Sequence, residues 1–297
     1  MKSSRECATT TQSRLSNFRV HTTLGIMAKY GTPGRVKTRL GKEIGMEVAA
    51  RVHCRFVAEL TYRLSDAAVC CQLVATPAED QHRWRPGAGQ PEPTIASDTA
   101  RKNKLKRHAA SNKDKIDIPD RWEIVDQGSG DLGQRMRRWF ESCLLVAAAD
   151  QTDPISVPAK ELKAAILIGA DCPRLTAADI AKGFDALHRN DLVLGPAEDG
   201  GYYLIGLRQP ADWNRTCQQP SPWSHLWTNI PWSTNDVFSA TLAAARRDDL
   251  SVSLLPSRSD VDTASDLNRL RGELERSTGP DDDRLQADLN AMLDAVQ

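Results

Sequence analysis

The sequence lacks several features that would assign a protein to a class directly. None of its apolar runs approaches the roughly 18 residues of a membrane-spanning helix, and residues 1–20 contain no apolar stretch typical of a secretory signal. Lysine and arginine total 39, as do aspartate and glutamate, so the chain has no excess of positive charge of the kind found in nucleic-acid-binding domains. We therefore expect neither a membrane span nor a nucleic-acid partner.

The cysteines and histidines also lack a recognisable pattern. Cysteine occurs seven times without a CxxC pair, and none of the six histidines has the spacing of a metal ligand. A disulfide framework or a structural zinc site needs more regular spacing. We therefore expect free thiols and predict a cytoplasmic protein.

The chain does contain enough apolar material for a large core, since 40% of its 297 residues are hydrophobic. Short apolar runs alternate with amphipathic stretches, which predicts an α/β fold with a mainly parallel sheet. The predicted strands are Thr23–Lys29, Val69–Ala75, Trp122–Val125, Ala164–Gly169, Asp191–Leu194, Tyr202–Leu207 and Val252–Leu255. The predicted helices are Met46–Leu64, Leu132–Ala149, Asp179–Asn190, Thr234–Arg247, Thr263–Arg276 and Asp281–Val296.

Two segments differ from this alternating pattern. Residues 1–20 are polar, and we expect a loose N-terminal tail. Residues 81–120 are first rich in Pro and Gly and then basic, which indicates an insertion in a single domain spanning 21–297. We interpret the basic run as a solvated loop or exposed helix; an anion-binding or nucleic-acid-binding patch is the alternative.

A cationic loop, Gly31–Leu40, follows the first predicted strand. Its Gly and Pro residues allow a sharp turn at the carboxyl end of a strand, where open α/β sheets bind their ligands. Arg35, Lys37 and Arg39 place three cations in this loop, which suits a di- or triphosphate. Lys37 follows Val36 instead of glycine, so the Walker pattern is not met. We predict a phosphate-binding loop; the alternative is a surface loop whose cations face water.

A glycine-rich turn, Gln127–Gly133, formally matches the dinucleotide fingerprint GxGxxG. It lies in the middle of the chain and not in the first strand–helix unit, which argues against that interpretation. Two interpretations stay open. The turn could approach a nucleotide base or ribose, or it could be a tight turn that places Asp131 at a helix N-terminus.

Two aspartates form a candidate metal site. The apolar strand Ala164–Gly169 delivers Asp171 to its carboxyl end, where a carboxylate pairs with a metal, a cation or a ligand. Mg²⁺ takes few protein oxygens besides substrate phosphates, and Asp262, after the last strand, could complete the site. The alternative for Asp171 is a helix cap, although Thr176 is better placed for that role; the alternative for the second motif is that Asp262 or Thr263 caps the helix that follows.

The segment Leu192–Leu207 contains Asp199-Gly200-Gly201 between two apolar runs. On pattern alone this is a hairpin turn. The functional alternative places Glu198 and Asp199 over the site, where they hold sugar hydroxyls or act as a base.

Six motifs together resemble a bacterial transferase family that is often labelled glycosyltransferase and is found beside radical-SAM selenodomain and arsenosugar genes. In chain order they are PGRVKTRL, QGSGDLGQRM, LIGADCPRLT, LGPAEDGGYYLIGL, PWSTNDVF and DVDTASDL. The resemblance covers about Thr23–Asp266 except the basic insertion. More distantly, the chain is similar to the guanylyltransferases for molybdenum cofactor and for phospholactate.

The resemblance implies a GT-A (nucleotide-diphospho-sugar transferase) fold, a three-layer α/β/α sandwich. It places Asp171 and Asp262 at a Mg²⁺ or Mn²⁺ ion. Arg35, Lys37 and Arg39 would bind the phosphates, Gly128, Asp131 and Gly133 would border the base and ribose, and Glu198 and Asp199 would face the second substrate.

We therefore expect a metal-dependent transferase with a nucleotide-activated donor and a small-molecule acceptor. Glycosyl transfer from a sugar nucleotide is the first hypothesis, with Asp199 as a candidate base. The alternative is nucleotidyl transfer from a nucleoside triphosphate with release of pyrophosphate. A nicotinamide oxidoreductase that uses Gly128–Gly133 and a non-catalytic nucleotide or sugar sensor are the rivals from other classes.

Overall fold

The computed structural model describes residues 20–84, 118–145, 162–210 and 222–294. Its strands form one sheet in the order β3-β2-β1-β4-β6-β5-β7. Among the described strands, β6 alone is antiparallel to its neighbours, β4 and β5, and the other pairs are parallel. The strands are β1 (Val20–Lys29), β2 (Cys70–Thr76), β3 (Trp122–Asp126), β4 (Leu162–Gly169), β5 (Leu192–Pro196), β6 (Tyr202–Arg208) and β7 (Val252–Leu254).

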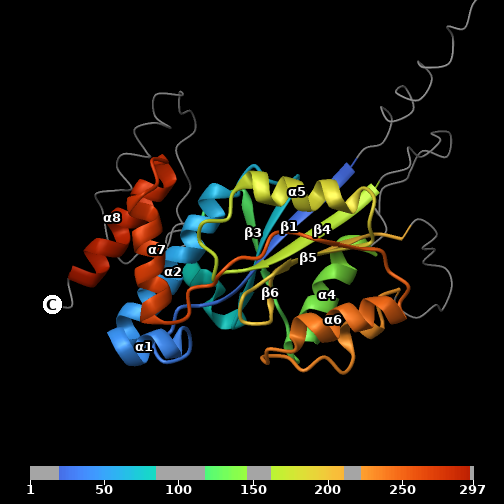
Figure 1. Ribbon diagram of the computed structural model, residues 1–297, viewed down its shortest axis with the longest axis horizontal. Helices are drawn as coiled ribbons and strands as arrows, with labels where there is room; N and C mark the ends of the chain where they lie inside the picture. The colour runs from blue at the N-terminus through green and yellow to red at the C-terminus, as the bar shows by residue number, and fades with distance from the viewer. Residues whose placement is uncertain (1–19, 85–117, 146–161, 211–221, 295–297) are drawn as a thin grey trace, which may run out of the picture.

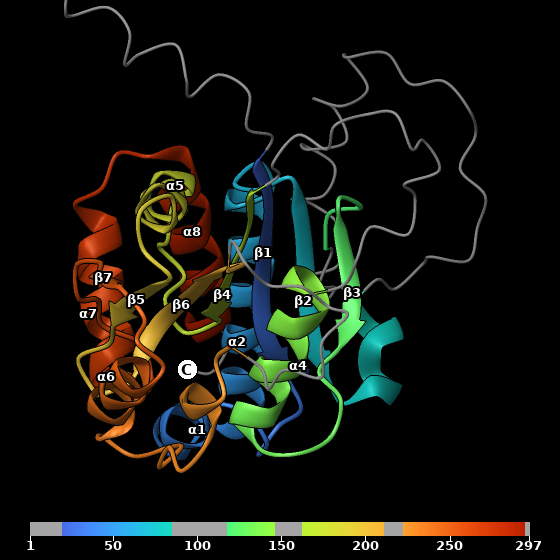
Figure 2. The same cartoon turned by 90° about the vertical axis from the view of Figure 1, so that its right-hand side faces the viewer.

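Helices cover both faces of this sheet (Figures 1 and 2). The α-helices are α1 (Thr38–Ile44), α2 (Met46–Arg63), α4 (Leu132–Leu144), α5 (Ala177–Leu187), α6 (Val237–Arg247), α7 (Ala264–Glu275) and α8 (Pro280–Asp294). Two 3₁₀ helices, η1 (Ala78–Trp84) and η2 (His225–Trp227), lie between them.

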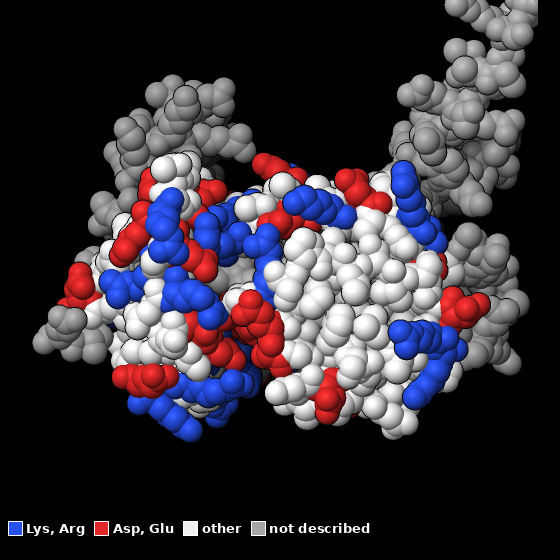
Figure 3. All heavy atoms as spheres, in the orientation of Figure 1, with Lys and Arg blue, Asp and Glu red and all other residues white. Residues whose placement is uncertain are grey.

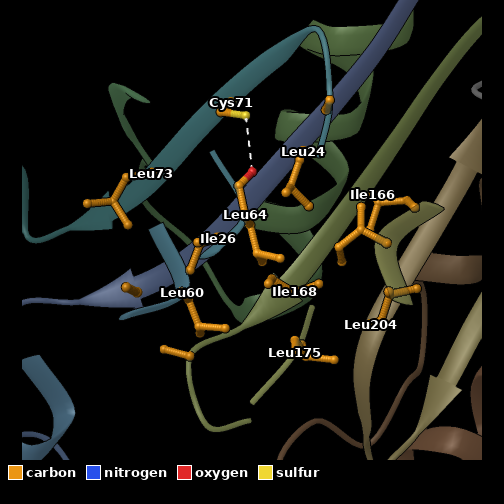
Figure 4. Packing of buried hydrophobic residues seen from close by; sticks show 14 of the residues in the cluster. Leu24, Ile26, Leu60, Leu64, Cys71, Leu73, Ile166, Ile168, Leu175 and Leu204 are labelled. Carbon is orange, nitrogen blue, oxygen red and sulfur yellow. Dashed lines mark hydrogen bonds between the residues drawn. The ribbon is translucent and has the colours of Figure 1, made fainter. Parts of the chain in front are cut away.

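Strand alternation explains the two layers of helices. Successive strand residues point to opposite faces of a sheet. In β4, Ile166 packs in the cluster that contains the apolar residues of α2 and α5, whereas Leu167 packs in the cluster that contains those of α4 and α6. Figure 4 shows Leu24 and Ile26 of β1 in the first cluster. The predicted α/β/α sandwich with a mainly parallel sheet is therefore confirmed.

A third apolar cluster joins α7 and α8 to α1 and α2. It contains Leu40 of α1, Phe56 of α2, Leu270 of α7 and Leu289 of α8. Val261, in the loop before α7, is buried in the same cluster. Because Leu40 and Val261 share this cluster, the loop after β1 and the loop after β7 are held against each other.

The predicted elements agree with the structure except at some ends and in one missed helix. Helix α1 begins directly after Lys37, inside the segment expected to be a loop. Lys37 is its N-cap residue, in the left-handed conformation (φ 45°) and without a side-chain capping bond. The sequence therefore gives no capping signal. The helix expected over Thr234–Arg247 begins at Val237, after a turn.

Some predictions fall largely outside the described residues. The expected N-terminal tail lies outside them apart from Val20, which begins β1. Most of the expected insertion, 85–117, also lies outside, as do 146–149 of one helix and 295–296 of another. At the two described ends of the insertion, Trp84 and Ile118 are buried in the core.

Strand direction determines where a site can form. Since β1, β4, β5 and β7 run the same way, the loops that follow them lie at one edge of the sheet. Within the described ranges, each helix is too short or too polar to span a bilayer.

Candidate functional site

Lys37 is the centre of the candidate site. Its side chain is only 3% exposed, and its Nζ forms ion pairs with Asp171 and, at 3.2 Å, with Asp262 Oδ1. Nζ also donates a hydrogen bond to the carbonyl oxygen of Val261 at 2.5 Å. An ammonium has three N–H donors, so these three acceptors use all of them. The loops after β1, β4 and β7 therefore meet at one atom.

Electrostatics keep this cluster charged. Burial by itself would lower the pKa of Lys37, but the nearby charges of Asp171 and Asp262 outweigh it and raise that pKa. Burial would likewise raise the pKa of Asp171, yet the Lys37 charge and hydrogen bond lower it. At neutral pH the ammonium and the Asp171 carboxylate are both ionised.

Asp171 and Asp262 do not cap helices. Thr176 caps α5 and Thr263 caps α7, each with a side-chain bond from the third helical residue. The capping alternative is therefore wrong for Asp171 and Asp262 and confirmed for Thr263, and the two carboxylates interact with Lys37.

The other two cations of the loop lie at the surface. Arg39 is on α1 with a side chain that is 70% exposed, and its Nη2 lies 3.4 Å from Asp262 Oδ2. Arg35 is also exposed. Both guanidinium groups are accessible to an anion from solvent, unlike the Lys37 ammonium.

An acidic cavity of about 150 Å³ lies beside the Lys37 cluster. It is lined by Arg39, Glu198, Asp199, Ser259, Asp260, Asp262, Thr263, Asp266 and Arg269. Burial, followed by the charge of Asp199, raises the pKa of Asp260 to about 6. The carboxylates around this cavity therefore repel one another. Figure 3 shows acidic side chains gathered in the middle of one face, between a highly charged region and a broad uncharged one.

A second cavity of about 220 Å³ adjoins the first. The two share Glu198, Ser259, Asp266 and Arg269. Its other lining residues come from the loop after β4, the loop after β7 and α7. The two cavities together form one crevice with room for a small molecule.

Glu198 and Asp199 occupy the turn between β5 and β6. The antiparallel pairing of these strands confirms the predicted hairpin. Asp199 Oδ1 accepts a hydrogen bond from the Gly201 N–H at 2.9 Å, which stabilises the turn. Both residues also line the acidic cavity. The hairpin and the position over the site are therefore compatible.

The structure does not bring Gly128, Asp131 and Gly133 to the Lys37 cluster or to either cavity. Asp131 is the N-cap of α4, where its Oδ1 accepts a bond from Gln134 N–H at 2.8 Å. Gly133 packs against Trp232, whose ring leaves no space for a Cβ. These contacts support the tight-turn interpretation and leave contact with a base or ribose as a prediction.

The sequence does not reveal three further groups, of which Asp260 and the Val261 carbonyl lie at the site and Gln127 does not line either cavity. Gln127, at the start of the glycine-rich turn, is buried and donates to the carbonyl oxygens of Ala28 in β1 and Val74 in β2. Asp260 and the Val261 carbonyl belong to the quoted motif DVDTASDL, but no role was assigned to them. The pattern Asp260-Val261-Asp262 indicates two acidic side chains on either side of one buried apolar residue.

The carboxylates suit a hard divalent cation. Asp171 and Asp262 both contact the buried ammonium of Lys37, so their carboxylates lie close together. Carboxylate oxygens are preferred ligands of Mg²⁺. In the described part of the chain, no group of three or more His, Cys, Asp or Glu side chains could hold a metal. The pair would therefore share an ion with substrate oxygens and water, as Mg²⁺ sites commonly do.

Comparisons with known proteins agree with this fold. The model of a family described as "uncharacterized protein conserved in bacteria (DUF2064)" matches residues 87–234. A crystal structure from Desulfovibrio desulfuricans, of a protein provisionally named nucleotide-diphospho-sugar transferase, is 26% identical to this chain with a TM-score of 0.63. The match covers 93% of this chain and 97% of that one. The predicted nucleotide-diphospho-sugar transferase (GT-A) fold is therefore confirmed.

More distant matches have TM-scores below 0.5. A 4-diphosphocytidyl-2C-methyl-D-erythritol synthase from Anaerococcus prevotii is 12% identical, covers 86% of this chain and 99% of that one, and has a TM-score of 0.41. A nucleotidyl transferase from Methanothermobacter is 11% identical to this chain, with a TM-score of 0.43. The match covers 87% of this chain and 99% of that one. No curated protein matches the chain significantly.

Proposed function

We propose that this protein is a metal-dependent transferase that acts on a nucleotide-activated donor. The observation that carries the proposal is the convergence of Lys37, Asp171 and Asp262 at the carboxyl edge of the sheet, beside an acidic cavity. The likeness to a protein named for nucleotide-diphospho-sugar transfer supports it. The association with radical-SAM and arsenosugar genes, the loose tail with a single domain over 21–297, and the cytoplasmic location stay predictions.

Glycosyl transfer from a sugar nucleotide to a small-molecule acceptor is the first reaction we propose. An acceptor hydroxyl forms a bond to the sugar carbon while the bond from that carbon to the diphosphate oxygen breaks. Asp199, over the cavity, takes the proton of the hydroxyl, and Glu198 positions the acceptor. The exposed guanidinium groups of Arg35 and Arg39 neutralise the departing diphosphate.

The remaining proposed roles concern the donor. Asp171 and Asp262 would hold Mg²⁺ or Mn²⁺, which supplies charge stabilisation to the phosphates when bound. Gly128, Asp131 and Gly133 would border the base and ribose. Lys37 belongs to the phosphate-binding group, but its ammonium must first leave its three protein acceptors.

Nucleotidyl transfer is the second candidate, and the three cations of one loop favour it. In this reaction a substrate phosphate attacks the α-phosphorus of a nucleoside triphosphate, and pyrophosphate leaves. Pyrophosphate carries more charge than a nucleoside diphosphate, so it makes better use of Arg35, Lys37 and Arg39 together.

A donor screen with Mg²⁺ and Mn²⁺ tests the proposal and separates the reactions. Release of a nucleoside diphosphate from a sugar nucleotide indicates glycosyl transfer, and release of pyrophosphate from a nucleoside triphosphate indicates nucleotidyl transfer. Binding of NAD(H) without either release would favour an oxidoreductase. Nucleotide binding without turnover, unchanged in Asp171→Ala, would favour a sensor.

A further inference from the structure

Lys37 has no free donor for a phosphate in the arrangement described above. Its ammonium is saturated by Asp171, Asp262 and the Val261 carbonyl, and its side chain is closed off from solvent. The same two carboxylates are the proposed metal ligands. The Lys37 ammonium therefore occupies the place proposed for the metal ion, although Lys37 is also expected to bind the donor phosphates.

We infer that Lys37 is an exchangeable counter-ion: its ammonium competes with a divalent cation for Asp171 and Asp262, and, once displaced, binds the donor phosphates. This inference rests on the proposed function. It gives Lys37 a positioning role at the metal site that is separate from its contact with phosphate.

Charge repulsion makes the two cations exclude each other. Two carboxylates stabilise one ammonium at the centre of the cluster. A divalent ion on the same oxygens would lie a few ångströms from Nζ, whose side chain is buried while the two carboxylates are partly exposed, and the like charges would repel each other. The Val261 carbonyl alone could not offset that repulsion, so Lys37 has to leave the carboxylates.

The surroundings of Lys37 give the ammonium somewhere to go. The residues before and after it, from Pro33 to Arg35 and from Thr38 to Arg39, are exposed apart from Val36. The side chain has four rotatable bonds, so Nζ can turn toward solvent without movement of the core. There it would join the exposed guanidinium groups of Arg35 and Arg39, and all three cations would face the phosphates.

The exchange couples the binding of metal and donor. A phosphate that accepts the released ammonium offsets the cost of breaking the Lys37 ion pairs, so donor binding raises metal affinity. Linkage requires that metal binding raises phosphate affinity by the same factor. The metal alone should therefore bind the wild-type protein weakly.

The first test measures the affinity of the full chain for Mn²⁺ alone, from the electron paramagnetic resonance signal of free Mn²⁺. Lys37→Met removes the competing ammonium, and we expect Mn²⁺ to bind this variant at least about tenfold more tightly than the wild type. Lys42→Met is the matched control, because Lys42 is exposed on the same helix α1. We expect the control to bind Mn²⁺ as the wild type does.

A second measurement uses the wild-type protein, so it does not depend on the folding of a variant. Acylation of lysines, read by mass spectrometry, should leave Lys37 unmodified in metal-free protein and modify it when Mn²⁺ is added. Addition of inorganic pyrophosphate with Mn²⁺ should protect Lys37 again. Labelling of Lys42 should not change.

The outcomes separate this inference from the proposed function. If the wild type binds Mn²⁺ but Lys37→Met binds it no more tightly and Lys37 labelling does not respond, the exchange is wrong while a metal-dependent function can stand. If neither protein binds Mn²⁺, with or without pyrophosphate, the exchange and the metal-dependent function are both wrong.

Discussion

Some of the side chains with a proposed chemical role also have a structural one. Asp131 is the clearest case, because its carboxylate caps α4 while the resemblance places it beside a nucleotide. A single substitution to alanine would remove both functions at once. Asparagine keeps the oxygen that caps the helix and removes the charge, so a pair of variants separates the two roles.

We predict that Asp131→Ala lowers the free energy of unfolding by about 1 kcal/mol, whereas Asp131→Asn leaves it nearly unchanged. If the carboxylate also contacts the donor, both variants raise the donor KM. Urea unfolding and steady-state kinetics on the donor found in the screen measure the two effects. An unchanged KM in both variants would remove Asp131 from the binding site and leave it as a helix cap.

The burial of Lys37 could not be predicted from the sequence, because its partners are distant in the chain. The cationic loop is recognisable because Arg35, Lys37 and Arg39 are close in sequence. The partner carbonyl of Val261 is 224 positions away, and only the packing of α7 and α8 against α1 and α2 brings it to Lys37. From the sequence, all three cations look equally available to phosphate.

At the scale of elements, local signals predicted most of the fold. The apolar run Ala164–Gly169 became β4, buried at the sheet centre, and Thr176 caps α5 as expected. Helix α1 was missed because it is 7 residues long and starts without a capping side chain. The order of strands depends on pairings between distant segments, which periodicity does not report.

Asp191 joins three elements at the edge of the sheet. It lies just before β5, pairs with Arg208 of β6 at 2.6 Å and accepts from the Ser251 N–H at 3.0 Å. Burial would raise the pKa of Asp191, but the bonds from Ser251 and Arg208 outweigh it and lower that pKa. These contacts therefore add to the backbone pairing of β7 with β5, and they are strongest while the carboxylate is ionised.

The pH dependence of stability follows from this lowered pKa. A carboxyl whose pKa is lower in the folded than in the unfolded state stabilises the fold above its unfolded pKa of about 3.9, and this contribution is lost as the pH falls through the folded pKa. We predict that Asp191→Asn destabilises the protein at pH 7 and much less at the lowest pH where it still folds. Urea unfolding across this range measures the effect, and Asp185→Asn, an exposed change on α5, is the control. An equal loss at all pH values would contradict the ionic explanation.

At the scale of the whole molecule, a buried charge network fixes α8 to α2. Glu59 of α2 is fully buried and accepts from Arg55 and Arg63 of the same helix and from Arg284 of α8. Arg63 also pairs with Asp282 of α8 at 2.6 Å. Together with the apolar cluster of α1, α2, α7 and α8, the network holds the loop that carries Asp262 in place.

We predict that Glu59→Gln lowers the free energy of unfolding by about 3 kcal/mol, because it removes the buried anion that Arg55, Arg63 and Arg284 share, although each keeps a second carboxylate partner. Glu275→Gln, an exposed change at the end of α7, should stay within about 0.5 kcal/mol of the wild type. Chemical denaturation followed by circular dichroism measures both. A loss as small for Glu59 as for Glu275 would show that the network does not hold the helices together.

Asp171 and Asp262 are the proposed ligands of a divalent ion beside the cationic loop. A Mn²⁺ titration carried far enough to saturate a weak site, on the wild type and on the double variant Asp171→Asn/Asp262→Asn, tests this assignment, with calorimetry as the readout. We predict one ion per wild-type chain and loss of that binding in a double variant that remains folded. The same affinity and stoichiometry in both proteins would place the ion elsewhere and contradict the account.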